Sequence, residues 1–282
     1  MILDYIRKII KKQQEQGSNL LYIRSTIKEY LQIIVLSYLY THKQYKDNLI
    51  FTGGTCLRHF FNLERLSEDL DFDSTVSTDT KGIADDMYRF FKSSLQYPDL
   101  SIAVKQHGKQ ILLKFPILTK LNLAQKSESD YVYIKCDIEK IAGKNYTVLK
   151  TSKSIFGYNF VARHFDLPSL MAGKTAAIIN RNLLSGTENR EIIKGRDFYD
   201  FLWFIKMGVK INYKFLKDKL QNRDITSENL RTIISQRITE AVTKYKNDFK
   251  NDLLPFISDP RFLDDYIENY KNEFDRLRID FV

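Results

Sequence analysis

The most informative part of this sequence is residues 52–73, TGGTCLRHFFNLERLSEDLDFD. The short apolar run 48–52 that leads into it predicts a buried strand, which Gly53 and Gly54 end with a sharp turn of the backbone. We expect a helix to begin at this turn, with Thr55 as its cap and with apolar side chains on one face. The local pattern is therefore strand, tight turn and helix.

The end of this stretch alternates acidic and apolar residues. In an extended strand Asp69, Asp71 and Asp73 share one face, because successive side chains point to opposite faces. Residues 64–73 hold five acidic side chains against one arginine, and like charges at this spacing destabilise a sheet unless a cation compensates them. Mg²⁺ suits this need, because it is commonly bound by one or two carboxylates together with substrate phosphates.

For a lone Asp-x-Asp, the simplest interpretation is an edge strand whose carboxylates face water. Here the Gly-Gly turn and helix start come first, and thirteen residues separate Thr55 from Asp69. Backbone N–H groups at such a turn can hold phosphate oxygens while the carboxylates hold a metal ion. The combination favours a metal-dependent nucleotide site.

The same residues resemble the first motif of the AbiEii/MenT nucleotidyltransferases. The resemblance rests on Gly53-Gly54-Thr55 followed by Arg65-x-Ser67-Glu68-Asp69-Leu70-Asp71-Phe72-Asp73. Members of this family are toxins of type IV toxin–antitoxin systems and form a branch of the DNA polymerase β-like superfamily. The resemblance implies an α+β fold, in which a nucleotidyltransferase domain with a small mixed sheet flanked by helices precedes a helical C-terminal domain.

The chain changes character near residue 165. Asp166-Leu167-Pro168 is typical of a helix start, and the sequence after it is almost entirely helical in pattern. We therefore predict a nucleotidyltransferase domain with N-terminal helices over 1–165 and a basic helical domain over 166–282 that contributes nucleotide and acceptor contacts. The predicted helices are 1–16, 20–42, 77–97, 168–182, 213–221, 226–245 and 262–274, and the further predicted strands are 100–106, 110–116, 131–138, 147–150 and 158–163.

Asp137 is the candidate third carboxylate, because an acid among apolar neighbours late in a buried strand is costly unless it is paired or liganded. The family resemblance implies that it is a metal ligand or a general base toward the attacking hydroxyl. A structural pairing with Lys135 or an arginine is the alternative, and Glu139 lies on the same face as a substitute candidate.

A second set of candidates lies after the proposed boundary. The run Gly173-Lys174-Thr175 resembles the end of a P-loop motif. We reject a P-loop, because Pro168 stands where the motif requires a glycine and the segment is predicted to lie inside a helix. The stretches 171–181 and 195–200 instead resemble the downstream family motifs. By this resemblance Lys174 contacts the triphosphate, and Asp197 or Asp200 positions the lysine or the substrate.

Further phosphate candidates are Arg196 and Arg181, and the polar stretch 184–194 is expected to be a loop that closes over nucleotide. The complete predicted nucleotide-binding set is Gly53, Gly54, Thr55, Arg65, Ser67, Lys174, Arg196, Asp197 and Asp200. The predicted catalytic set is Asp69, Asp71, Asp137 and Lys174, of which the three carboxylates are the predicted ligands of a two-ion Mg²⁺ site.

Composition agrees with a polyanionic partner. The formal net charge is +9 and the pI is about 9.2, which favours nucleic acid and nucleotide phosphates. The two cysteines, Cys56 and Cys136, are too few for a disulfide framework or a zinc site. No apolar segment is long enough to span a bilayer and no signal peptide is evident, so we expect a cytoplasmic protein without a membrane partner.

The resemblance implies transfer of a nucleoside monophosphate from an NTP to an RNA acceptor, with the 3′ end of tRNA as the expected target and a block of translation and growth as the outcome. A cognate antitoxin is expected to be encoded nearby. Two alternatives are nucleotidylation or phosphorylation of a protein, and a non-catalytic module that binds GTP or RNA.

Overall fold

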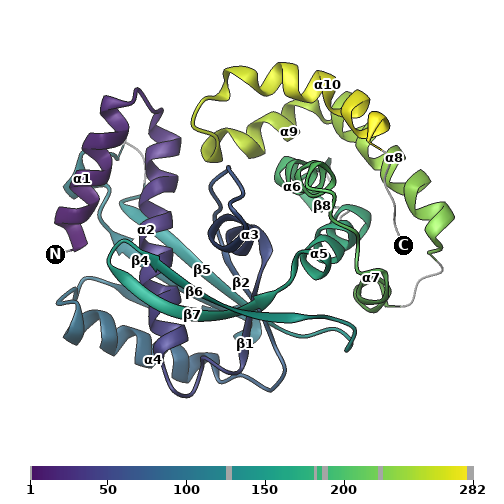
Figure 1. Cartoon of the computed structure of the whole chain (residues 1–282). Helices are drawn as coiled ribbons and strands as arrows, with labels where there is room; N and C mark the ends of the chain where they lie inside the picture. Colours follow the sequence, from purple (N-terminus) through teal and green to yellow (C-terminus); the bar gives the residue numbers. More distant parts are fainter. Residues whose placement is uncertain (1, 125–128, 181–182, 186–189, 222–224, 278–282) are drawn as a thin grey trace. The chain divides into compact units, whose positions relative to one another are not determined.

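The structure is a computed structural model that describes residues 2–124, 129–180, 183–185, 190–221 and 225–277 (Figure 1). The chain forms two compact units. The first, here called the sheet unit, comprises Met1–Ile141 and Leu149–His164, and the second, the helical unit, comprises Ala142–Val148 and Phe165–Val282.

The sheet unit is built on one seven-stranded mixed sheet, in the order β3-β4-β5-β2-β1-β7-β6 (Figure 1). Strand β2 is parallel to β5 and antiparallel to β1, while β1 is parallel to β7. The strands are β1 (Leu49–Thr52), β2 (Leu70–Ser74), β3 (Ser101–Lys105), β4 (Gln110–Pro116), β5 (Tyr131–Lys140), β6 (Val148–Ile155) and β7 (Tyr158–Phe165). The acidic strand β2 thus lies at the centre of the sheet, with a neighbour on each side.

Helices flank this sheet. The long helix α2 (Leu20–Thr41) is apolar on most sides and largely buried, and it packs on β5 and on α1 (Ile2–Glu15) (Figure 1). Its first turn is capped by the Asn19 side chain. Helix α3 (Gly53–Phe61) packs on β1 and β2, and α4 (Thr80–Arg89) packs on β3 and β4. The predicted α+β fold is confirmed.

The helical unit is formed by α5 (Leu167–Asn180), α6 (Gly195–Lys206), α7 (Tyr213–Lys219), α8 (Ser227–Thr243), α9 (Lys246–Leu253) and α10 (Leu263–Arg276). Helix α5 contacts α6, α7 and α8, while α9 contacts α6, α8 and α10. Strands β8 (Leu183–Ser185) and β9 (Arg190–Ile192) lie between α5 and α6 in the chain and pair antiparallel. The core of this unit is rich in aromatic rings, including Phe198, Phe249 and Tyr270.

Several local predictions differ from the structure. Thr55 is not the cap of α3, because the helix begins two residues earlier, at Gly53, whose positive φ of 76° lets the chain turn at once. The predicted helix 77–97 begins only at Thr80, capped by Asp79, and continues beyond Arg89 as a π-helical turn, Phe90–Ser94. The polar stretch 184–194 contains part of the β8–β9 pair, and Arg181 lies outside the described residues. Among the helices that the structure describes, none is both long and apolar enough to cross a membrane.

Candidate active site

The Gly-Gly turn brings the start of α3 against the acidic strand. A Cβ built on Gly53 would overlap Asp71 Oδ2, so the glycine backbone lies where a side chain cannot. A Cβ on Gly54 would lie 2.6 Å from the Arg65 guanidinium and 2.9 Å from Ser67 Oγ. Since the first N–H groups of a helix have no partner within it, the turn presents backbone donors beside a carboxylate.

Two carboxylates lie side by side on neighbouring parallel strands. Asp71 on β2 is the register partner of Asp137 on β5, so their side chains point to the same face of the sheet. Asp69 lies two residues before Asp71 and shares this face. The neighbouring thiol of Cys136 reports the same grouping, because burial and the charges of Asp137, Asp69 and Asp71 all raise its pKa. Within the sheet unit, Asp71 and Asp137 thus lie side by side, and Asp69 lies just before Asp71 along the chain.

Each flanking acid has a different partner. Gln110 on β4 is opposite Asp137 in the antiparallel register and donates its amide to Asp137 Oδ1 at 2.8 Å. Lys135 places its Nζ 3.6 Å from Asp69 Oδ1. The sequence allowed Asp137 to pair with Lys135 or with an arginine. In the described residues Lys135 instead contacts Asp69, and Asp137 accepts from the neutral Gln110 amide. Gln110 was not a sequence candidate, because nothing in its local sequence marks it as a neighbour of a residue 27 positions away.

The segment that leads into Asp69 is held by buried polar groups. The Gln32 amide on α2 donates to the carbonyl oxygens of Ser67 and Glu68, at 3.2 and 2.7 Å. The Thr55 hydroxyl donates to the Asp69 carbonyl at 2.5 Å. Because these bonds join α2, α3 and the loop, they fix the backbone from which the Asp69 carboxylate projects.

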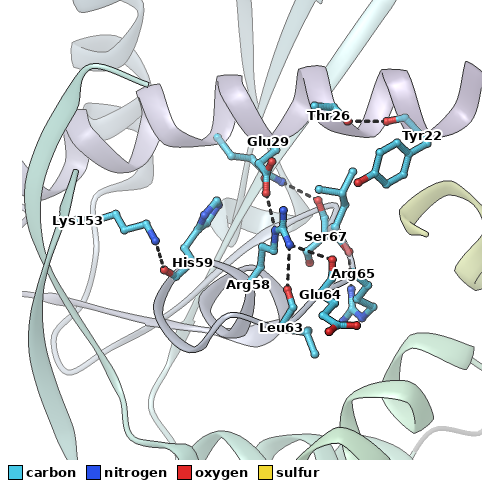
Figure 2. A network of polar contacts seen from close by, with 12 residues as sticks. Tyr22, Thr26, Glu29, Arg58, His59, Leu63, Glu64, Arg65, Ser67 and Lys153 are labelled. Carbon is cyan, nitrogen blue, oxygen red and sulfur yellow. Dashed lines mark hydrogen bonds and ion pairs between the residues drawn. The ribbon is translucent and has the colours of Figure 1, made fainter. Parts of the chain in front are cut away.

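Arg65 and Ser67 are buried beneath this turn rather than displayed on the surface. Arg65 is 1% exposed and donates to the Leu66 carbonyl at 2.8 Å. Figure 2 shows Arg65 and Ser67 beside Arg58, whose guanidinium bonds the Glu29 carboxylate at 2.7 Å and the Leu63 and Glu64 carbonyls. In this arrangement both predicted nucleotide-binding side chains support the Gly54 turn.

The helical unit contains a second charged cluster. Lys174 on α5 contacts Asp197 Oδ1 at 2.9 Å and Asp200 Oδ2 at 2.8 Å, both on α6. Lys174 is 15% exposed at its side chain and Asp200 is fully buried. Burial makes the negative charge of two carboxylates costly unless cations and hydrogen bonds compensate it, and Lys174 provides part of that compensation. The expected link between the lysine and these two aspartates is present.

Arg196, at the start of α6, is held by α9 and by the turn after it. Its backbone N–H and its Nε both donate to Asp252 Oδ2, at 2.9 and 3.2 Å, and its guanidinium lies 4.5 Å from the ring centre of Phe256. A Cβ on Gly195 would overlap the carbonyl oxygen of Phe249. Asp252 therefore caps α6 from another helix, a contact that the sequence did not reveal.

The donor set suits a divalent cation that is completed by a substrate. Among the described residues, no three His, Cys, Asp or Glu side chains converge as a ready-made metal cage. Mg²⁺ does not need such a cage, since one or two carboxylates and the phosphates of a nucleotide commonly hold it. The Asp71–Asp137 register pair with Asp69 beside it provides hard oxygen ligands of this kind.

The family model of the nucleotidyl transferase AbiEii toxin, type IV toxin–antitoxin system, matches residues 35–276. The chain belongs to the AbiEii nucleotidyltransferase toxin family. This match spans both units and includes the Gly-Gly turn, the three carboxylates and Lys174. No curated protein matches the sequence.

Solved structures are similar to this chain. MenT4, a nucleotidyltransferase toxin from Mycobacterium tuberculosis, aligns with a TM-score of 0.54 at 13% identity, covering 96% of this chain and 90% of its own. JHP933 from Helicobacter pylori aligns with a TM-score of 0.48 at 15% identity, covering 90% and 91%. The family model shows a nucleotidyltransferase toxin of a type IV system, which implies a nucleotide substrate and an antitoxin partner.

Proposed function

We propose that this AbiEii-family toxin transfers a nucleoside monophosphate from an NTP to an RNA acceptor, namely the 3′ end of tRNA, and so blocks translation. The observation that carries the proposal is the side-by-side placement of Asp71 and Asp137 on parallel strands, with the Gly53 turn against Asp71. Carboxylates beside helix-start N–H groups are the arrangement that a metal-bound triphosphate needs.

We assign roles to the residues of the sheet unit that are consistent with this arrangement. Asp69 and Asp71 would hold Mg²⁺, with Asp137 as a further ligand or as the base that accepts the proton of the attacking hydroxyl. Bound Mg²⁺ supplies charge neutralisation on the phosphates and lowers the pKa of the acceptor hydroxyl. The backbone N–H groups of Gly54 and Thr55 would hold phosphate oxygens. The Thr55 hydroxyl is not assigned this role, because it already donates to the Asp69 carbonyl.

The helical unit is assigned to phosphate and acceptor binding. Lys174 would neutralise the departing pyrophosphate, and Asp197 and Asp200 would keep its ammonium in position. Arg196 is the weaker phosphate candidate, since Asp252 and Phe256 already hold its guanidinium. The net charge of +9 suits an RNA acceptor. We place the protein in the cytoplasm, with its antitoxin encoded beside it.

Incubation with bulk tRNA, Mg²⁺ and each α-labelled NTP in turn tests this proposal. Label on tRNA with the wild type, and none with an Asp69→Ala, Asp71→Ala double variant, is the expected result and identifies the preferred base. Label on protein instead would establish protein nucleotidylation. NTP binding without any transfer would establish a non-catalytic module.

A further inference from the structure

Lys135 is a cation directly beside the acidic side chains of the sheet. It lies two residues before Asp137 on β5, so both side chains point to the same face of the sheet. The register of β2 with β5 pairs Leu70 with Cys136, which brings Lys135 level with Asp69. Its Nζ is 3.6 Å from Asp69 Oδ1.

Asp69 needs a counter-charge in the metal-free protein. Its Oδ1 atom is buried, and a buried carboxylate oxygen is costly without a nearby cation. Two other carboxylates of the face are held differently, since Asp137 accepts from the neutral Gln110 amide and Asp71 lies against Gly53. The charge of Lys135 is thus directed at Asp69.

The geometry of this contact suits an ammonium group that can dissociate from the carboxylate. At 3.6 Å it is looser than a hydrogen-bonded ion pair, and the Lys135 side chain is 39% exposed. Partly exposed pairs contribute little free energy, and the flexible lysine stem can carry its ammonium into water without losing a fixed geometry. A divalent cation that binds Asp69 would repel this ammonium, because both are cations held at the same carboxylate.

We propose that Lys135 is an exchangeable counter-ion, whose ammonium neutralises Asp69 in the metal-free toxin and is released when a divalent cation binds there. The inference rests on the proposed metal-dependent function. It predicts the sign of one effect, namely that removing this lysine increases the affinity for the metal ion. A lysine that made no contact with Asp69 would leave the affinity for the metal alone nearly unchanged.

Titration of the full-length protein with Mn²⁺ alone, followed by the electron paramagnetic resonance signal of the free ion, tests the inference without catalysis. We expect Lys135→Met to lower the dissociation constant for Mn²⁺ about two- to five-fold, the range given by a partly exposed ion pair. Lys135→Arg keeps the charge and should bind Mn²⁺ as the wild type does. Lys120→Met removes a lysine of similar exposure that pairs with Asp99, so it controls for net charge and should change nothing.

The Asp69→Asn variant, with and without Lys135→Met, distinguishes a failure of the counter-ion role from a failure of the proposed metal site. With the ligand oxygen altered, adding Lys135→Met should give no further gain, as a coupled pair requires. Wild-type affinity in Lys135→Met, while Asp69→Asn weakens Mn²⁺ binding, would overturn the counter-ion role and leave the proposed metal site standing. Equal Mn²⁺ binding by the wild type and Asp69→Asn would overturn both. Thermal unfolding curves confirm that each variant is folded.

Discussion

Gly53 and Asp71 fit together so closely that a Cβ on the glycine would overlap the Asp71 carboxylate oxygen Oδ2. The glycine also has a φ of 76°, a backbone conformation that other residues adopt at a cost. The turn that starts α3 and the carboxylate on β2 therefore form one steric unit, and a change at the first displaces the second.

Gly53→Ala should remove transferase activity far beyond its cost in stability. The added methyl group strains the backbone and pushes the Asp71 carboxylate aside, and a displacement of about 1 Å can cost about 100-fold in rate. Gly17→Ala is the matched control, because Gly17 has a φ of 71° with open space around its Cα. The positive φ should cost each variant about 1–2 kcal/mol of unfolding free energy, and Gly53→Ala should lose somewhat more because its methyl group also meets Asp71. Similar activity in the two variants would contradict the steric role.

Asp71→Asn and Asp137→Asn should each abolish transfer while leaving the protein folded. The two carboxylates are register partners on parallel strands, and removing one like charge relieves repulsion. The midpoint temperature of unfolding without metal should therefore stay the same or rise. Substantial activity in either variant, measured as label transferred per enzyme, would mean that chemistry occurs elsewhere.

Lys174→Met should destabilise the protein severely, so its loss of activity alone says little about catalysis. Removing the ammonium takes a cation away from the buried Asp197 and Asp200 carboxylates, and breaking a buried ion pair typically costs about 3–5 kcal/mol. Combining it with Asp200→Asn should restore much of the stability. Chemical denaturation measures this rescue. A rescued but inactive double variant supports the proposed phosphate contact, and an active one refutes it.

His59 should make stability fall in mild acid. Burial first, then the charges of Lys153 and Arg58, lower its pKa from 6.5 to about 3. Between these values the unfolded chain binds a proton that the folded protein does not, so the unfolding free energy falls as the pH falls. The contribution of His59 to the slope of the unfolding free energy against pH approaches about 1.4 kcal/mol per pH unit.

His59→Leu should flatten that decline, because the leucine cannot be protonated in either state. The His59 Nε2 atom is buried without a hydrogen-bond partner in the described part of the chain, so the apolar replacement leaves no new unsatisfied group. Midpoints of urea unfolding from pH 7 to pH 4 give the comparison, with the exposed His107→Asn as control. Parallel curves for His59→Leu and the wild type would contradict this explanation.

The sequence predicts the centre of the sheet unit well because the signals there are local. Alternating acidic and apolar residues define β2, and the glycines mark the turn before α3. Helix α9 was missed, since its eight residues carry a weak apolar pattern. The contacts of Gln110 with Asp137 and of Asp252 with Arg196 join residues 27 and 56 positions apart, and no local pattern encodes such pairings.

Burial of the polar residues was equally hard to foresee. Arg65 is a charged residue next to an acidic strand, which predicts a phosphate contact, yet it is 1% exposed beneath the Gly54 turn. Its position follows from the space that a glycine leaves for a guanidinium. The metal requirement and the acceptor remain predictions from the residue pattern and the family.

The most direct test of the central claim follows the two ends of the triphosphate with wild type and Asp71→Asn, using total tRNA and an NTP labelled at either the α or the γ phosphate. Nucleotidyl transfer at the Asp71–Asp137 site predicts α label on the RNA, γ label released as pyrophosphate in equal amount, and neither with Asp71→Asn. Transfer of the γ label to the RNA or to a protein, or unchanged transfer by Asp71→Asn, would contradict it.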